Sequence, residues 1–156
     1  MITHSQPATQ LMRGNAPRNV LESVLAALAT NRISEAVARF NDAFIFCDRA
    51  LGLEFVDKAR LGEFFRKSRE LFPEIVLEVT STYECGDHVI AEWQITGAQM
   101  VHYGYGGFQL RLPISVRGVS VVRTENGRVS HWSDYYDAAA SRRTALAVPF
   151  TEFHEY

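Results

Sequence analysis

Apolar residues in the first half of the chain recur every three to four positions, the spacing of one helix face. These stripes predict a helix over residues 20–28, a shorter one over residues 33–40 and a third over residues 61–72. Asp57 is suited to cap the start of the third helix. Pro73 ends it, because proline lacks the backbone N–H that a helix interior needs.

After Pro73 the pattern changes to alternating apolar and polar residues, which predicts strands. Asn126-Gly127 is a strong signal for a hairpin turn, and Pro113 marks a point where a strand can break. Helices followed by hairpin-linked strands predict an α+β fold, with a strongly curved antiparallel sheet wrapped around about three helices. The predicted strands are residues 44–48, 75–83, 89–96, 110–124 and 128–136.

The 156 residues suit a single domain. Residues 1–16 are polar and without periodicity, so they predict a flexible arm, and residues 17–140 form the predicted domain. Residues 141–156 form a tail with apolar residues that could cap a pocket or lie on a second subunit. Residues 103–108 place three glycines among three aromatics, which suits a flap, a bulged strand or a long hairpin loop.

Charge and composition narrow the expected partners. Sixteen basic and eighteen acidic side chains give a formal net charge of -2 without a basic run, so no nucleic acid or membrane partner is expected. No stretch approaches the ~20 apolar residues that span a bilayer, and the first residues lack the pattern of a secretion signal. Cys47 and Cys85 have no metal or redox spacing, so a cytoplasmic protein with free thiols is expected.

The last predicted strand carries an acid among aromatic rings. Trp132, Asp134 and Tyr136 share one face, because side chains alternate along a strand. A carboxylate held among large rings either finds partners or has its pKa raised. Asp134 is therefore a candidate catalytic acid or base, and the alternative is an ion pair with an arginine such as Arg111 or Arg117.

Asp48 is the second candidate catalytic residue. It follows Phe44 and Phe46 at a period of two and shares their apolar face, where an unpaired carboxylate is costly. This placement indicates a general base with a raised pKa, and the alternative is a strand-end residue that reaches solvent or caps a turn, helped by Arg49. Two carboxylates in one dry cavity would push their pKa values apart, which suits a division of acid and base roles.

Five further residues are candidates for lining a ligand pocket. Trp93 lies on an apolar strand face, where core packing is its alternative role. His102, next to the glycine-rich segment, is suited to orient a ligand or to lie in solvent. No two histidines show ligand spacing, so no metal site is predicted, and no cofactor is expected. The pocket candidates are Phe46, Trp93, His102, Trp132 and Tyr136.

Two segments resemble the nuclear transport factor 2-like superfamily, which includes SnoaL-like polyketide cyclases, ketosteroid isomerases, scytalone dehydratase and limonene epoxide hydrolases. Residues 20–40, VLESVLAALATNRISEAVARF, look like its opening helix pair. Residues 114–137, ISVRGVSVVRTENGRVSHWSDYYD, look like the closing hairpin of the epoxide hydrolases and SnoaL-like proteins. The resemblance implies a cone-shaped fold and a homodimer formed through the outer sheet face, while function must be argued from the site.

The resemblance carries over unevenly to the catalytic positions. Asp48 stands where ketosteroid isomerases place the general base and where epoxide hydrolases place a water-holding Asn. Asp134 matches the acid of the epoxide hydrolase triad, but the Arg and Asp of that triad are replaced by Trp93 and Ile95. The acid and the tyrosine of the isomerase oxyanion hole are likewise replaced, by Gly118 and Val24.

The leading hypothesis is an enzyme that performs cofactor-free acid/base chemistry on an apolar, oxygenated molecule such as a polyketide, terpenoid or steroid-like compound. Isomerisation, cyclisation, dehydration and hydrolysis all fit two pocket acids. The alternative is a non-catalytic ligand-binding or dimerisation module. The missing oxyanion donors favour it, because they remove a large electrostatic contribution to catalysis. A protein-transport adaptor is a third hypothesis, which the aromatic surroundings of Asp134 disfavour.

Overall fold

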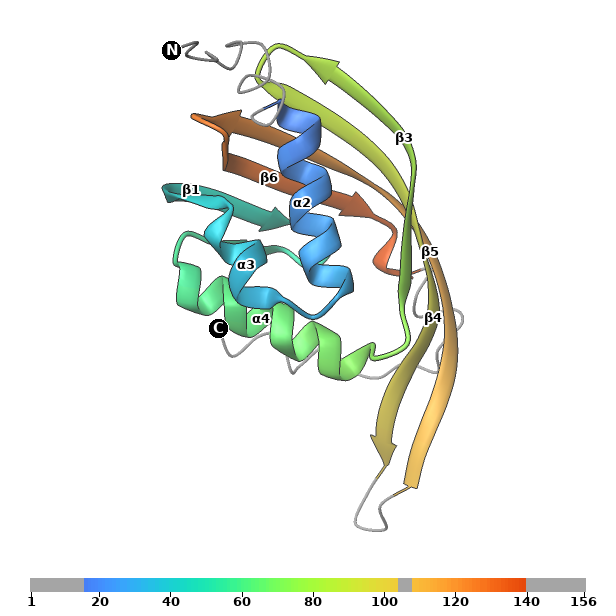
Figure 1. The fold of residues 1–156 in the computed structure, drawn as a ribbon. Coiled ribbons are helices and arrows are strands. Elements are labelled where there is room, and N and C mark those ends of the chain that lie inside the picture. Colours follow the sequence, from blue (N-terminus) through green and yellow to red (C-terminus); the bar gives the residue numbers. More distant parts are fainter. Residues whose placement is uncertain (1–15, 104–107, 140–156) are drawn as a thin grey trace, which may run out of the picture.

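The structure is a computed structural model that describes residues 16–103 and 108–139, without the side chains that flank the gap. The helices of this part cover the concave face of one curved sheet (Figure 1). The strand order in the sheet is β2-β1-β6-β5-β4-β3. In chain order the elements are α2 (Pro17–Ala29), α3 (Ile33–Ala38), β1 (Phe40–Asp48), β2 (Leu53–Phe55), α4 (Lys58–Leu71), β3 (Val76–Cys85), β4 (His88–Tyr103), β5 (Phe108–Glu125) and β6 (Arg128–Tyr136).

The predicted α+β fold is confirmed, and its sheet is mixed. Every neighbouring pair of strands runs antiparallel except β1 and β6, which are parallel. Local turn signals reveal only hairpins, so they could not show that the last strand returns beside the first. The short strand β2 was also absent from the sequence prediction.

The helix predictions are confirmed with one change at a boundary. Asp57 caps α4, since its Oδ1 accepts a hydrogen bond of 2.9 Å from the backbone N–H of Arg60. The helix ends at Leu71, two residues before Pro73. Phe40 was predicted to belong to the second helix, but it begins β1 and is fully buried. A large apolar residue at an element boundary fits either pattern, so burial alone could not place it.

Strands β4 and β5 are longer than predicted, with 16 and 18 residues, and Pro113 does not interrupt β5. Strand β6 pairs with β5 only between Gly118 and Glu125. At Pro113 the described part of the sheet therefore leaves one side of β5 unpaired, where proline is tolerated. In β4, Gly97 pairs with Ile114, has a φ of 141° and allows the backbone before β3 to approach closely, since a Cβ there would lie 2.9 Å from the Cα of Ile75.

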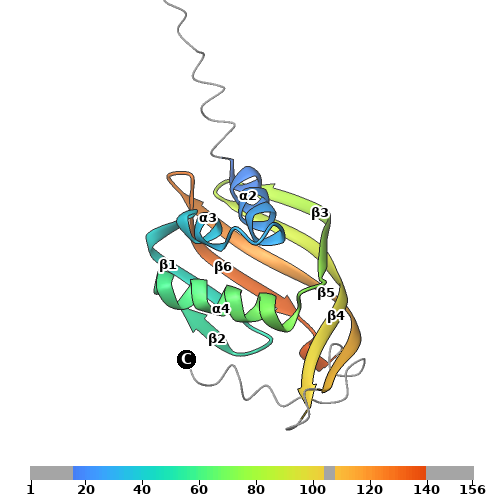
Figure 2. The ribbon, with the colours of Figure 1, turned by 60° about the horizontal axis from the view of Figure 1, so that its bottom comes forward.

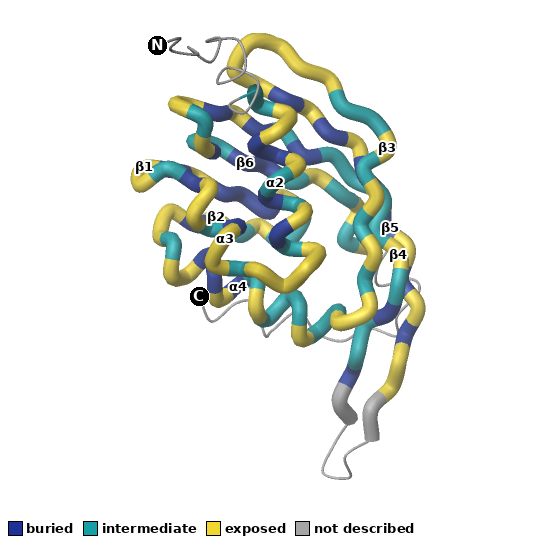
Figure 3. Tube along the Cα trace, in the orientation of Figure 1, coloured by how far each residue is buried: buried dark blue, intermediate teal, exposed yellow. Residues whose placement is uncertain are grey.

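The core lies between the helices and the central strands, and Figure 3 shows the buried positions concentrated there. Both cysteines are free, as expected. No helix among the described residues is long and apolar enough to cross a membrane. The predicted arm up to residue 15, the glycine-rich residues 104–107 and the tail from residue 140 lie outside the described residues, and the domain boundaries stay predictions.

Candidate functional site

A cavity of about 230 Å³ lies between the helices and the sheet. Figure 2 shows that α2 and α4, which contribute to its lining, lie over the same face of the sheet. Its lining is predominantly apolar and comes from α2, α4 and strands of the whole sheet except β2. The side chain of His102, at the far end of β4, is not described. The cavity is lined by both candidate acids and by the other candidate pocket residues: Asp48, Asp134, Phe46, Trp93, Trp132 and Tyr136.

The parallel pairing of β1 with β6 brings the two acids together. Asp48 and Asp134 are direct partners in this pairing, and so are Phe46 and Trp132. Neighbouring strands lie about 4.8 Å apart, so the two carboxyl groups project side by side from one sheet face. Two residues earlier on each strand, the rings of Phe46 and Trp132 stack on each other with centroids 6.3 Å apart.

Asp48 is buried, with 5% of its surface exposed. Its Oδ1 accepts a hydrogen bond of 2.9 Å from the backbone N–H of Leu51 in the following turn. Its Oδ2 accepts one of 2.8 Å from the hydroxyl of Tyr136. Burial raises the pKa of Asp48, and these hydrogen bonds oppose the rise. The group therefore caps a turn, as one sequence interpretation expected, without reaching solvent or Arg49.

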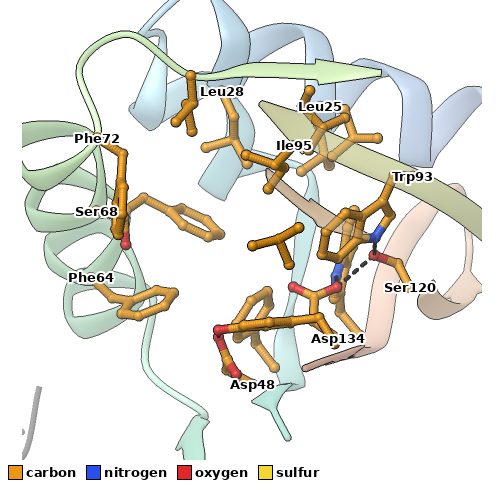
Figure 4. A pocket seen from close by; sticks show the side chains of 18 of the residues that line it. Leu25, Leu28, Asp48, Phe64, Ser68, Phe72, Trp93, Ile95, Ser120 and Asp134 are labelled. Carbon is orange, nitrogen blue, oxygen red and sulfur yellow. Dashed lines mark hydrogen bonds between the residues drawn. The ribbon is translucent and has the colours of Figure 1, made fainter. Parts of the chain in front are cut away.

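Asp134 belongs to a hydrogen-bonded chain that includes both tryptophans of the protein. Its Oδ1 accepts a bond of 2.5 Å from the hydroxyl of Ser120 and one of 2.6 Å from the indole Nε1 of Trp132. The Ser120 hydroxyl in turn accepts a bond of 2.9 Å from the Nε1 of Trp93. Figure 4 shows this chain on the sheet side of the cavity. Two neutral donors thus hold Oδ1 of Asp134 in a fixed orientation.

The other oxygen of Asp134 is directed into the cavity. Oδ2 has no hydrogen bond to any residue in the described part of the chain, and Figure 4 shows it facing the open space. The ion pair between Asp134 and an arginine, which was the alternative from the sequence, does not form in the described part of the chain either. Arg111 pairs instead with Glu74 at 2.5 Å. No Lys, Arg or His side chain within the described ranges forms an ion pair with the carboxyl group of Asp134.

This environment raises the pKa of Asp134 to about 7. Burial is the main cause, because it penalises the charged form, and the negative charge of Asp48 adds to it. The hydrogen bonds from Ser120 and Trp132 act in the opposite direction. Near neutral pH the group is thus close to half protonated, which suits proton exchange with a ligand. Burial and the charge of Asp48 also raise the pKa of Tyr136, which stays a neutral hydroxyl.

The absence of a side chain at Gly118 makes room for the ring of Trp93. The two residues are direct partners in the pairing of β4 with β5, and the Trp93 ring crosses over Gly118 to reach Ser120. A Cβ at Gly118 would collide with that ring and would lie 2.8 Å from the carbonyl oxygen of Tyr135. An acid side chain at position 118 would therefore have no room beside the Trp93 ring.

Ser120 is a hydrogen-bonding site residue that sequence reasoning missed. It is a short polar residue, 2% exposed, between Val119 and Val121 of β5. Its inward direction depends on the register of β5 against β6, in which Ser120 faces Asp134 directly. The described residues contain no group of three or more His, Cys, Asp or Glu side chains that could hold a metal ion.

A curved sheet over helices, enclosing an apolar cavity with two acids, defines a small α+β protein of the cone-shaped class. The SnoaL-like domain family matches residues 21–132, which is most of the chain. The chain therefore belongs to the SnoaL-like domain family. No curated protein matches the chain at a significant level.

Solved structures show the same fold at low sequence identity. A protein from Shewanella denitrificans assigned to the SnoaL-like polyketide cyclases aligns with a TM-score of 0.70 and 14% identity, covering 82% of this chain and 95% of that one. An LEH-like epoxide hydrolase from M. tuberculosis gives 0.65 and 16%, covering 85% and 90%. A protein with a ketosteroid isomerase-like fold from Catenulispora acidiphila gives 0.66 and 18%, covering 80% and 90%. These likenesses confirm the predicted fold.

Proposed function

We propose that this protein binds an apolar, oxygenated small molecule in the cavity and transforms it by cofactor-free acid/base chemistry. The ligand class is that of polyketide, terpenoid or steroid-like ring compounds. The observation that carries the proposal is the pair of adjacent carboxyl groups, Asp48 and Asp134, in one apolar cavity. An acid with a raised pKa and an oxygen directed into such a cavity is typical of a proton-exchanging site.

The hydrogen bonds suggest different roles for the two acids. Asp134 exchanges a proton with the ligand through Oδ2, because Ser120 and Trp132 already occupy Oδ1. Asp48 accepts hydrogen bonds on both oxygens, so it acts as the charged partner that orients the Tyr136 hydroxyl, whose oxygen then accepts a hydrogen bond from a ligand hydroxyl or a water molecule. Tyr136 is a stationary hydrogen-bonding group in this arrangement.

The alternative is a ligand-binding protein of the same fold without catalysis. Trp93 and Gly118 leave no room for the acid of the isomerase oxyanion hole, and Val24 replaces its tyrosine. Without such donors a developing oxyanion loses a large stabilising contribution. The homodimer expected from the resemblance and the cytoplasmic location also stay predictions, and sedimentation tests the former.

Solvent deuterium incorporation distinguishes the two functions. A panel of cyclic ketones, aryl ketones and terpene epoxides is incubated with the protein in D₂O, with binding followed by thermal stabilisation and products by mass spectrometry. We expect at least one bound compound to gain deuterium or water. Asp134→Asn should slow that reaction by roughly 10²- to 10⁴-fold while binding persists, because a general acid or base contributes about that factor.

Glu63→Gln, which removes an exposed carboxylate on α4, is the matched control and should react like the parent protein. Binding without any incorporation would contradict catalysis and support the binding module. Absence of binding by every compound would contradict both functions.

A further inference from the structure

A second cavity of about 320 Å³ lies between α2, α4 and β3. It shares part of its lining with the cavity that holds the acids, so the two cavities adjoin each other. The shared residues form a junction, and all of them except Ser68 are apolar. The junction consists of Leu25, Leu28, Phe65, Ser68, Ile75 and Leu77.

The junction lies at the end of the first cavity that is away from the acids. Figure 4 shows Leu28 and Ser68 on the helix side, across the open space from Asp134. Beyond the junction the second cavity is lined by aliphatic residues such as Ala26 and Val79. The polar residues Glu22, Asn31 and Arg69 also line it. Together, the two adjoining cavities extend from the acids past the apolar junction to these polar residues.

Size and chemistry indicate what fills this path. The first cavity, at about 230 Å³, is smaller than the roughly 300–1,000 Å³ of ordinary ligand pockets, and adding the second brings the site within that range. The lining of the junction favours hydrocarbon, because the Ser68 hydroxyl is the only polar side-chain group among the six junction residues.

We infer that the second cavity is an extension of the ligand site that takes an aliphatic chain, so the natural ligand is an elongated amphiphile. Its oxygenated head lies at Asp134 and Tyr136, and its hydrocarbon chain passes the junction toward Arg69. This inference rests on the proposed ligand-binding function and specifies the shape of the molecule bound.

The test uses 4-alkylphenols from 4-ethylphenol to 4-octylphenol, with affinity measured by calorimetry. The phenol hydroxyl serves as the oxygenated head and the alkyl group as the chain. In the parent protein, affinity should rise about fourfold for each added methylene up to the octyl compound, because each buried CH₂ contributes about that factor. Ala26→Phe should leave the ethyl compound unaffected and end the rise at a shorter chain.

Ala26 and Ala29 are exposed on α2 and line only the second cavity, so either substitution to Phe narrows it without disturbing the core. Ala59→Phe, at an exposed position of α4 outside both cavities, is the matched control and should keep the full rise. If affinity stops rising in the parent protein as early as in Ala26→Phe, the inference is wrong while the inner pocket stands. If no alkylphenol binds, both the inference and the inner pocket are overturned.

Discussion

At about pH 8, Asp134→Asn is expected to raise the free energy of unfolding by ~2–4 kcal/mol relative to the parent protein. The pKa of Asp134 rises from 3.8 to about 7 on folding, mainly because of burial. Asparagine keeps an oxygen to accept the hydrogen bonds from Ser120 and Trp132 but carries no charge. The variant therefore avoids the cost of a buried carboxylate.

The sign of the pH dependence follows from proton binding. The folded protein holds a proton on Asp134 at pH values where the unfolded chain has lost it, so the stability of the parent falls between about pH 4 and pH 7. Above that window the penalty is complete, and below it the parent and Asp134→Asn should be equally stable. Urea unfolding at several pH values measures the difference.

Glu63→Gln is again the matched control, because it removes one negative charge from the surface of α4. It should change stability by less than about 0.5 kcal/mol at every pH. A stability difference for Asp134→Asn that does not vary with pH would contradict the raised pKa. An acid that destabilises the fold at neutral pH contributes nothing to packing, so its presence indicates a functional role.

Phe46→Ala is expected to lower the free energy of unfolding by about 3–5 kcal/mol, the usual cost of removing a buried phenylalanine ring. Phe46 is 3% exposed and stands between the core and the cavity. Its ring has centroid distances of 5.6–6.4 Å to the rings around it, so its loss leaves a hole that many partners border. These partners are Phe40, Phe55, Phe64, Phe65 and Trp132.

Phe46→Leu keeps most of the apolar volume and should cost clearly less, which separates the loss of packing from a general intolerance of substitution. Both variants are measured by urea unfolding at a pH of about 6. At that pH the destabilisation by charged Asp134 is incomplete, and it is the same in both variants. A cost below ~1 kcal/mol for Phe46→Ala would show that the aromatic cluster is not the main support of the cavity wall.

Much of the fold could be predicted because its signals are local. The helical stripes before Pro73, the cap at Asp57 and the Asn126-Gly127 turn all depend on residues close together in the chain. The shared face of Trp132 and Asp134 also follows from strand geometry alone. The sequence therefore sufficed to choose both acids as candidates.

The rest depended on contacts between distant segments. A bulge between Arg123 and Thr124 shifts the register of β5 against β6, so that Asp134 faces Ser120. A regular two-residue hairpin would place Asp134 opposite Val119, and Ser120 would point outward. The parallel pairing that makes Asp48 the neighbour of Asp134 likewise has no local signal.

Nuclear magnetic resonance of the tryptophan side chains tests the central claim most directly. The chain has two tryptophans, so its ¹⁵N–¹H spectrum should contain two indole signals. Trp132 donates its indole N–H to Asp134, and Trp93 is linked to the same carboxyl group through Ser120. Asp134→Asn is the control, because it removes the carboxyl group whose protonation the signals should report.

We predict that at least the Trp132 signal shifts with a midpoint near pH 7 in the parent protein and that this shift is absent in Asp134→Asn. A Trp132 signal that stays constant between about pH 5 and pH 9, or one that titrates equally in both proteins, would contradict a raised pKa at Asp134 and with it the acid/base site.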